Sequence, residues 1–207
     1  MGPPGAGKGT QGELLELHLN AVRYSTGDVL REASRTGTEL GKLAQTYMDA
    51  GDLVPDEVVI GVVGEALEAL APDASVILDG FPRTIPQAEG LAGLLDDAGQ
   101  RLDAVVNLVV PEEELVSRLS SRRVCSECGT LASLESVASG SCAACEGDLI
   151  QRTDDLPETV SRRLGVYLEE TAPVLEWYAD SPVEMLEIDG IGSVDEIQDR
   201  IREQLAT

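Results

Sequence analysis

The sequence predicts an α/β fold in which a parallel sheet carries helices on both faces, and three observations support this prediction. A glycine-rich loop at residues 2–10 leads directly into a leucine-bearing helical stretch. The apolar run at 75–79 is bounded by turn residues and ends in an acid, which is typical of a buried parallel strand. Further along the chain, strand candidates alternate with helical stretches. With 207 residues, the chain is long enough for one large domain with a sizeable core.

Most of the expected elements are defined by apolar spacing and by the residues that begin or end them. Gly51 stops one helix, Asp56 is a candidate N-cap for the next, and Pro173 is expected to bend a long helix. Residues 122–150 lack helical periodicity and are rich in Cys, Ser, Gly and Glu, so we interpret them as a small inserted module. In chain order, we expect a helix ending near Asn20, a strand at 21–25, helices at 28–35, 38–50 and 56–70, a strand at 75–79, a helix at 85–98, a strand at 104–110, a helix at 112–121, the module, a helix at 157–178, a strand at 183–188 and a helix from 193.

The chain is strongly acidic, with 38 Asp plus Glu against 15 Lys plus Arg and a formal net charge of −23. This charge argues against binding to nucleic acids or anionic membranes, which attract basic surfaces. The 43% hydrophobic content is nevertheless that of a globular protein. Lysine occurs only at Lys8 and Lys42, and an acidic, lysine-poor surface suggests a halophile, where concentrated salt screens self-repulsion. An ordinary acidic bacterial protein is the alternative.

The glycine-rich loop has the residues and spacing of a phosphate-binding loop. Gly2 and Gly7 are separated by four residues and followed by Lys8, with the hydroxyl residue Thr10 displaced by one position. Backbone N–H groups freed by the glycines, together with the following helix N-terminus, form a cradle for nucleotide phosphates. Lys8 would place its charge on the β and γ phosphates, and Thr10 would ligate Mg²⁺. A Gly-Pro turn that merely precedes a helix is the alternative.

The strand at 75–79 supplies the second half of such a site, because it delivers Asp79 to the carboxyl edge of the sheet, where ligands bind. Asp79 would hold Mg²⁺ through water. Arg83 follows at once, so a guanidinium is expected beside the metal. Phosphoryl transfer between two nucleotides needs several such cations, and guanidinium groups suit phosphate oxygens. Further arginines, each of which alone is more often a surface ion-pair partner, are expected to converge there.

The four cysteines form two Cys-x2-Cys pairs, Cys125 with Cys128 and Cys142 with Cys145, separated by 13 residues. This spacing is close to that of a two-knuckle zinc site, in which four thiolates hold a structural metal. Neither a signal peptide nor a membrane-spanning apolar run is visible, so we expect a cytoplasmic protein with reduced thiols. Disulfides are the alternative to zinc, and iron is an alternative metal.

His18 is the only histidine and lies in the first expected helix among leucines. We interpret it as a helix-surface or partly buried side chain rather than as a catalytic base. A single histidine in this position excludes catalytic triads built on Ser-His-Asp or Cys-His pairs.

With these motifs in place, the chain resembles adenylate kinases of the long-lid type with a four-cysteine zinc lid. The resemblance extends from Gly2 to the last helix and is carried by the motifs 2–10, 25–28 and 78–84 and by Arg152-x-Asp154-Asp155. It implies the P-loop nucleoside monophosphate kinase fold and reversible phosphoryl transfer from Mg-ATP to AMP, giving two ADP. It implies one domain over 1–207, with a core of 1–24, 55–120 and 156–207, an AMP-binding helical subdomain at 25–54 and a zinc-ribbon-like lid at 121–155. The expected partners are ATP, AMP and ADP, bound by a monomer, and the expected metals are Mg²⁺ and structural Zn²⁺.

The resemblance also implies the residues of the site, position by position. The catalytic group comprises Lys8, Arg83, Arg118, Arg122, Arg152 and Arg163. ATP would contact Gly5, Ala6, Gly7, Lys8, Gly9, Thr10, Arg118, Arg122, the backbone at Leu131 and Ala132, and Gly192. AMP would contact Thr26, Arg31, the backbone at Asp52, Leu53 and Val54, and Gly80, Phe81, Pro82, Arg83, Gln87, Arg152 and Arg163. The metals would bind to Cys125, Cys128, Cys142 and Cys145 for zinc, and to Thr10 and Asp79 for magnesium, Asp79 through water.

Two departures from the family pattern matter. The family's lid usually carries an aromatic residue where this sequence has Ala132. The family's first strand, which lies in the middle of the sheet, has no counterpart here, because only Met1 precedes the loop. Unless a segment upstream supplies that strand, we expect a gap at the centre of the core and a chain that folds poorly as written.

Two other functions remain open at this point. A kinase for UMP, CMP or GMP is the nearest rival, although Thr26 and Gln87 favour adenine, since Gln87 offers one donor and one acceptor to a base edge. A zinc-module binding protein without catalytic activity is the rival from another class. The presence of Lys8, Asp79 and Arg83 argues against it.

Overall fold

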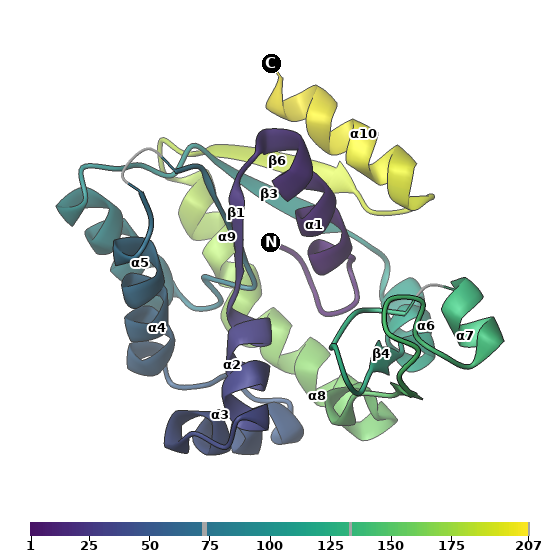
Figure 1. The fold of residues 1–207 in the computed structure, drawn as a ribbon. Helices are drawn as coiled ribbons and strands as arrows, with labels where there is room; N and C mark the ends of the chain where they lie inside the picture. Colours follow the sequence, from purple (N-terminus) through teal and green to yellow (C-terminus); the bar gives the residue numbers. More distant parts are fainter. Residues whose placement is uncertain (72–73, 133, 207) are drawn as a thin grey trace.

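The elements of the structure follow the predicted order, with helices distributed around short parallel strands (Figure 1). The computed structural model describes residues 1–71, 74–132 and 134–206. Its elements are α1 (Lys8–Leu19), β1 (Val22–Ser25), α2 (Thr26–Arg35), α3 (Glu39–Ala50), α4 (Asp56–Glu68), β2 (Val76–Asp79), α5 (Ile85–Asp97), β3 (Ala104–Val109), α6 (Glu112–Ser121), β4 (Val124–Cys125), α7 (Leu134–Ser139), β5 (Leu149–Ile150), η1 (Thr153–Asp155), α8 (Pro157–Val166), η2 (Tyr167–Thr171), α9 (Ala172–Ala179), β6 (Glu184–Asp189) and α10 (Val194–Leu205). None of the described helices is long and apolar enough to cross a membrane.

One expected helix start and one expected N-cap are wrong for identifiable reasons. Helix α2 begins at Thr26, two residues earlier than expected, because the Ser25 side chain caps it by accepting from the backbone N–H of Asp28. Asp56 is not an N-cap, since Pro55 holds that position and Asp56 is already helical. The Asp56 carboxylate accepts hydrogen bonds from α5 instead.

The long helix near the C-terminus is interrupted as expected, but by a π-helical turn rather than a simple bend. Residues 157–179 comprise α8, the π turn η2 and α9, and Pro173 lies just after the π turn. Proline has no N–H to donate to the preceding turn, and a π turn accommodates the backbone carbonyl that this leaves without a partner. The inserted module likewise differs from expectation, because it contains the short helix α7.

The strands form two separate parallel pairs instead of one continuous sheet. In the first pair β1 runs beside β2, with Ser25 opposite Asp79, and in the second β3 runs beside β6, with Val109 opposite Asp189. Strands β4 and β5 form a small antiparallel pair inside the module. The parallel pairs and their covering helices confirm the predicted α/β fold, and they bring the carboxyl ends of β1 and β2 together at one edge.

Met1 lies between the two pairs and occupies one position of a strand. Its terminal amino group donates to the carbonyl of Val106, and its carbonyl accepts from the N–H of Leu108 at 3.1 Å. This pattern places Met1 opposite Asn107 in a parallel arrangement. In Figure 1 the N-terminus is correspondingly seen in the middle of the molecule. Among the described residues, no named strand lies between β2 and β3, as the sequence predicts.

A cavity of about 660 Å³ extends through this gap. Its inner part is lined by apolar side chains from α1, β2, β3 and the last helices, including Leu15, Ile77, Val106, Tyr178 and Ile201. Its other part reaches the carboxyl edge of the strands, where Lys8, Asp79 and most of the residues expected to contact AMP are found. The core is accordingly divided into separate clusters around Ile188, Val63 and Val174.

Candidate active site

The glycine-rich loop forms a turn that leads directly into α1. Gly7 caps the helix in the left-handed conformation, with φ of 97°, and no side chain caps the first N–H groups of α1. Gly5 also has a positive φ, and a Cβ there would lie 2.9 Å from the Leu119 side chain. The backbone amides thus remain available at a helix N-terminus, which is the arrangement that binds phosphate.

Lys8 extends from this loop without any carboxylate partner among the described residues. Its Nζ donates to the backbone carbonyls of Gly2 and Pro3, at 2.7 and 2.9 Å. Burial lowers the pKa of Lys8 to about 7, the nearby Asp79 opposes that shift, and the charges of Arg83 and Arg163 add to it. A bound anion would offset both the cost of burying the Lys8 charge and its repulsion from the arginines, so this lysine favours a phosphate group.

Arg83 and Arg152 are the other cations of the site that lack carboxylate partners within the described chain. Arg83 donates from Nε to the carbonyl of Gly80 at 2.6 Å, and burial, followed by repulsion from Arg163, lowers its pKa to about 10. Burial and repulsion from Arg31 and Arg122 likewise lower the pKa of Arg152 to about 10. Cations gathered in this way, in a protein of net charge −23, indicate a site for a polyanion.

Asp155 fixes two further arginines of the predicted set. Its side chain is fully buried and accepts from Nε of Arg122 at 2.6 Å and from Nη1 of Arg163 at 2.9 Å. Arg163 also pairs with Asp154 at 3.2 Å. Arg118 is held separately, by Glu114 at 2.8 Å and the carbonyl of Gly190 at 2.9 Å. The sequence gives no role to Asp155, although it belongs to the motif that begins at Arg152.

The residues expected to contact AMP line the outer part of the cavity. They are Thr26, Arg31, Asp52, Leu53, Val54, Gly80, Phe81, Pro82, Arg83, Gln87 and Arg163, and Arg152 is not among the lining residues. Gln87 is 1% exposed, and its amide is held by two contacts: Nε2 donates to Asp56 and Oε1 accepts from the Arg83 backbone, both at 2.8 Å. Each of these atoms keeps one further hydrogen-bonding position.

Helices α2 and α3 form an arm that touches the segment after the module. Asp49 accepts from Thr153 at 2.8 Å, and Asp52 accepts from Arg162 at 2.7 Å. Gly51 ends α3 with φ of 78°, and a Cβ there would lie 3.2 Å from the Arg163 side chain. The arm therefore closes one side of the cleft over the arginines.

Asp79 reaches the loop from the end of β2 and fits an oxygen ligand for Mg²⁺. A Cβ built on Gly9 would lie 3.8 Å from its Oδ2, which places the carboxylate beside the start of α1. Carboxylate and hydroxyl oxygens are the hard donors that magnesium prefers. The nearest cation to Asp79 among the described residues is Arg23, at 3.1 Å.

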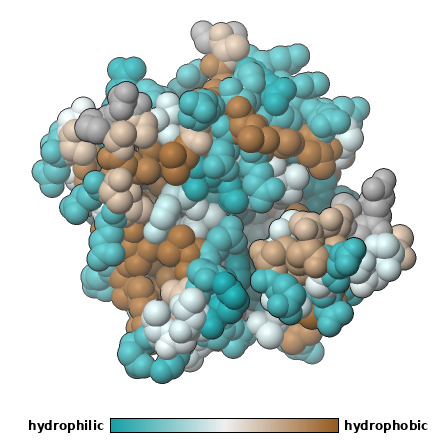
Figure 2. Space-filling view, viewed as in Figure 1, coloured by the Kyte–Doolittle hydropathy of each residue, from teal (hydrophilic) through white to brown (hydrophobic). Residues whose placement is uncertain are grey.

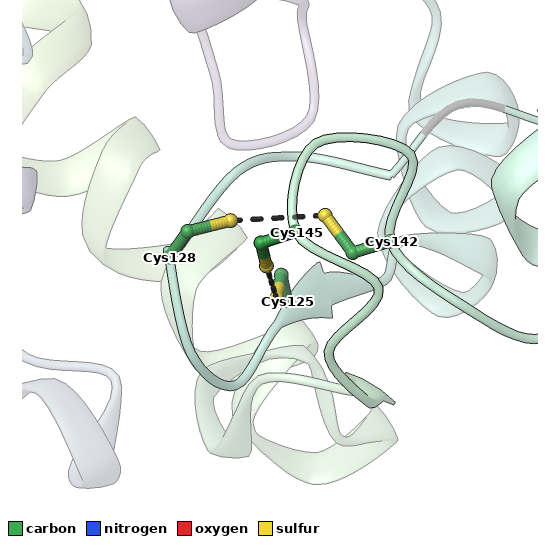
Figure 3. Close-up of side chains that lie close together, drawn as sticks. All are labelled: Cys125, Cys128, Cys142 and Cys145. Atoms are coloured by element: carbon green, nitrogen blue, oxygen red, sulfur yellow. Dashed lines mark hydrogen bonds between the residues drawn. The ribbon is translucent and has the colours of Figure 1, made fainter.

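The four cysteines lie together in the module, and their sulfurs point toward one another (Figure 3). The four Sγ atoms lie within 4.8 Å of one another, with 3.4 Å between Cys125 and Cys145 and 3.7 Å between Cys128 and Cys142. Tetrahedral zinc with bonds of ~2.3 Å needs sulfurs about 3.8 Å apart, so the cluster fits this metal. The two sulfurs of each close pair come from different knuckles, and all four cysteines are free thiols.

The residues expected to contact the adenine of ATP lie outside the cavity lining. Leu131 is 42% exposed and bridges Val124 within the module, and the N–H of Ala132 donates to the carbonyl of Arg123. Gly192 precedes α10 with φ of 127°. The single histidine, His18, is exposed near the end of α1 and remote from this chemistry, in agreement with its surface interpretation.

Comparison with known proteins identifies the family. The adenylate kinase family model matches residues 1–183. The adenylate kinase of Desulforamulus reducens is 50% identical over 183 residues, covering 86% of this chain and 85% of its own. That of Carboxydothermus hydrogenoformans is 47% identical over 208 residues, covering 99% and 97%, and that of Archaeoglobus fulgidus is 46% identical over 198 residues, covering 94% and 91%. The chain therefore belongs to the adenylate kinase family, whose members are nucleoside monophosphate kinases.

Proposed function

We propose that this chain transfers a phosphoryl group reversibly between Mg-ATP and AMP, giving two ADP, in the cleft between the glycine-rich loop, the arm and the module. The observation that carries this proposal is the gathering of Lys8, Arg83 and Arg152 without carboxylate partners among the described residues. Two polyanions must be brought together in the reaction, and half-buried cations without carboxylate partners supply the opposing charge.

We propose roles for individual residues from the family resemblance. The loop, Lys8, Arg118 and Arg122 would bind the ATP phosphates, and Leu131, Ala132 and Gly192 would contact the adenine of ATP. Thr26, Arg31, the 52–54 backbone, residues 80–83 and Gln87 would bind AMP, with Arg152 and Arg163 on the transferred group. Asp155 would act as a positioning residue, because its carboxylate accepts hydrogen bonds from both Arg122 and Arg163 and so holds the two guanidinium groups next to each other.

Magnesium would be held by the hydroxyl oxygen of Thr10 and, through water, by the carboxylate of Asp79, which suit it chemically. When bound, Mg²⁺ neutralises charge that develops on the phosphate oxygens. The protein itself aligns the acceptor phosphate and stabilises charge electrostatically. The reaction therefore needs no general base.

Water must be kept out, because it competes with AMP as an acceptor. We infer that residues 25–54 form an AMP-binding subdomain and residues 121–155 a lid, and that both close over the bound nucleotides. The contacts of Asp49 with Thr153 and of Asp52 with Arg162 support coupling between the arm and the segment at the end of the lid. Reopening of these parts would limit turnover.

An acceptor screen tests the proposed substrate. With Mg-ATP as donor and a coupled assay for ADP, we expect AMP to be at least about a hundredfold better in kcat/KM than UMP, CMP or GMP, because the held Gln87 amide offers the donor and the acceptor that the adenine edge needs and the cavity admits a purine. A preference for UMP, CMP or GMP would assign the chain to the related kinases. Binding of ATP without ADP formation would identify the non-catalytic binding protein instead.

We infer that the cysteine cluster holds a structural zinc ion and that the protein acts as a cytoplasmic monomer that binds neither nucleic acids nor membranes. The four free thiols at tetrahedral separations support the metal and require a reducing compartment. The acidic surface supports the absence of nucleic-acid and membrane partners. Metal analysis of the purified protein distinguishes zinc from iron.

We also propose that the acidic surface is an adaptation to concentrated salt. Acidic pairs and triplets such as 96–97, 112–114 and 169–170 lie mostly exposed, and hydrophilic residues cover much of the face in Figure 2. Salt screens their mutual repulsion, since the Debye length falls to about 3 Å at 1 M. We expect the melting temperature to rise by about 10 °C between 0.1 and 2 M KCl. An unchanged or lower melting temperature would contradict the proposal.

A further inference from the structure

Arg23 on β1 has a charged environment that none of the roles above explains. Its Nη1 donates to Oδ2 of Asp79 at 3.1 Å, and its Nη2 donates to Glu13 at 3.4 Å. Glu16 and Asp28 approach the same guanidinium at 3.7 and 3.6 Å. One guanidinium thus lies within 4 Å of four carboxylates. Among the described residues it is the only cationic side chain within 4 Å of the Asp79 carboxylate.

The fold keeps the Arg23 side chain in this position. The side chain is only 14% exposed and runs against α1 at Gly12, where a Cβ would lie 2.9 Å from Cδ of Arg23. Its Nε is buried without a hydrogen-bond partner, so the side chain is oriented by the contacts of its two terminal nitrogens. Strand β1 reinforces the orientation, because Ser25, two residues further on, is in register with Asp79.

We propose that Arg23 is a positioning residue that sets how strongly ATP binding depends on Mg²⁺, through the positive charge that it holds beside the Asp79 carboxylate. This inference rests on the proposed role of Asp79 as a magnesium ligand. A fixed positive charge beside that carboxylate makes the site less attractive to a divalent cation and more attractive to the free, highly negative ATP anion. Both effects lower the gain in affinity that Mg²⁺ brings.

A purely structural role for Arg23 makes a different prediction. Loss of its contacts would loosen β1 against α1 and lower stability, but it would weaken ATP binding to a similar extent with and without Mg²⁺. The ratio of the two ATP dissociation constants, measured in EDTA and in saturating Mg²⁺, therefore separates the electrostatic role from the structural one.

The experiment measures this ratio by calorimetry for the wild type, Arg23→Gln and Arg23→Lys. We expect the ratio to rise about tenfold in Arg23→Gln, which removes the charge, and to stay within about twofold of the wild type in Arg23→Lys, which retains it. Arg35→Gln is the matched control, because it removes the same charge from an exposed pair with Glu32 and should leave the ratio unchanged. If Arg23→Gln fails to fold, Arg23→Met keeps an unbranched stem against Gly12 and carries the same expectation.

Asp79→Asn separates the role of Arg23 from the role of Asp79 at the magnesium site. It should bring the ratio toward one, and adding Arg23→Gln to it should raise the ratio by less than Arg23→Gln does in the wild type, because only the weaker attraction for the free ATP anion remains. An unchanged ratio in the neutral Arg23 variants, with a reduced ratio in Asp79→Asn, would overturn the role of Arg23 alone. An unchanged ratio in Asp79→Asn would overturn the proposed magnesium ligand itself.

Discussion

Replacing Arg83 with alanine is expected to lower kcat for ADP formation by about 10³-fold while changing the ATP dissociation constant by less than about threefold. The reason lies in the position of the guanidinium. Arg83 lines the cavity on the proposed AMP side, is fixed by the carbonyl of Gly80 and has no carboxylate partner among the described residues. Its charge is therefore available to the phosphoryl group in the transition state, and it contributes little to holding ATP at the loop.

The same variant should not be less stable than the wild type. Burial and repulsion from Arg163 lower the pKa of Arg83 to about 10, so its charge is unfavourable in the free protein. Thermal unfolding of Arg83→Ala should give an equal or slightly higher melting temperature, which separates a catalytic loss from a folding defect. Arg35→Ala, at an exposed ion pair, is the control and should retain full activity. Equal losses in kcat and ATP affinity would contradict the assigned role.

Contiguous motifs account for the part of the site that the sequence predicts well. Lys8 and its glycines occur within a few residues of one another, and the fold needs only one turn into α1 to assemble them. The cysteine pairs are similarly local, and the structure brings all four sulfurs together. The α/β fold is also predictable, because apolar runs and helical spacing alternate along most of the chain.

Contacts between distant elements account for what the sequence analysis missed. Asp56 seemed to offer only a helix cap, yet it receives hydrogen bonds from Thr84 and Gln87, about 30 residues away. Asp155 holds Arg122 across the base of the module, and Arg23 reaches Asp79 from the neighbouring strand. An acid or an arginine considered alone is more often a surface residue, and only the tertiary structure decides which ones are buried beside an opposite charge.

The divided sheet leads to the second large effect, an increase in stability when a strand is supplied. Met1 already occupies one parallel position opposite Asn107, and the preceding positions would continue along β3 through the apolar part of the cavity. We expect five β-branched apolar residues fused before Met1 to raise the melting temperature by about 10 °C or more. Each buried Val or Ile side chain contributes about 1.5–3 kcal/mol and each ladder hydrogen bond about 1 kcal/mol, against about 1–2 kcal/mol per residue for backbone ordering.

An extension of five Gly and Ser residues is the matched control, since it adds equal length but no side chains to fill the gap between β2 and β3. It should leave the melting temperature within about 2 °C of the unextended chain. The apolar extension should also raise kcat, because the strand leads directly into the loop and restrains Gly2, whose carbonyl anchors Lys8. Equal melting temperatures for the two extended proteins would mean that the gap closes by rearrangement of the existing strands. In that case a strand between β2 and β3 would add no stability, and the gap would be no reason to expect poor folding.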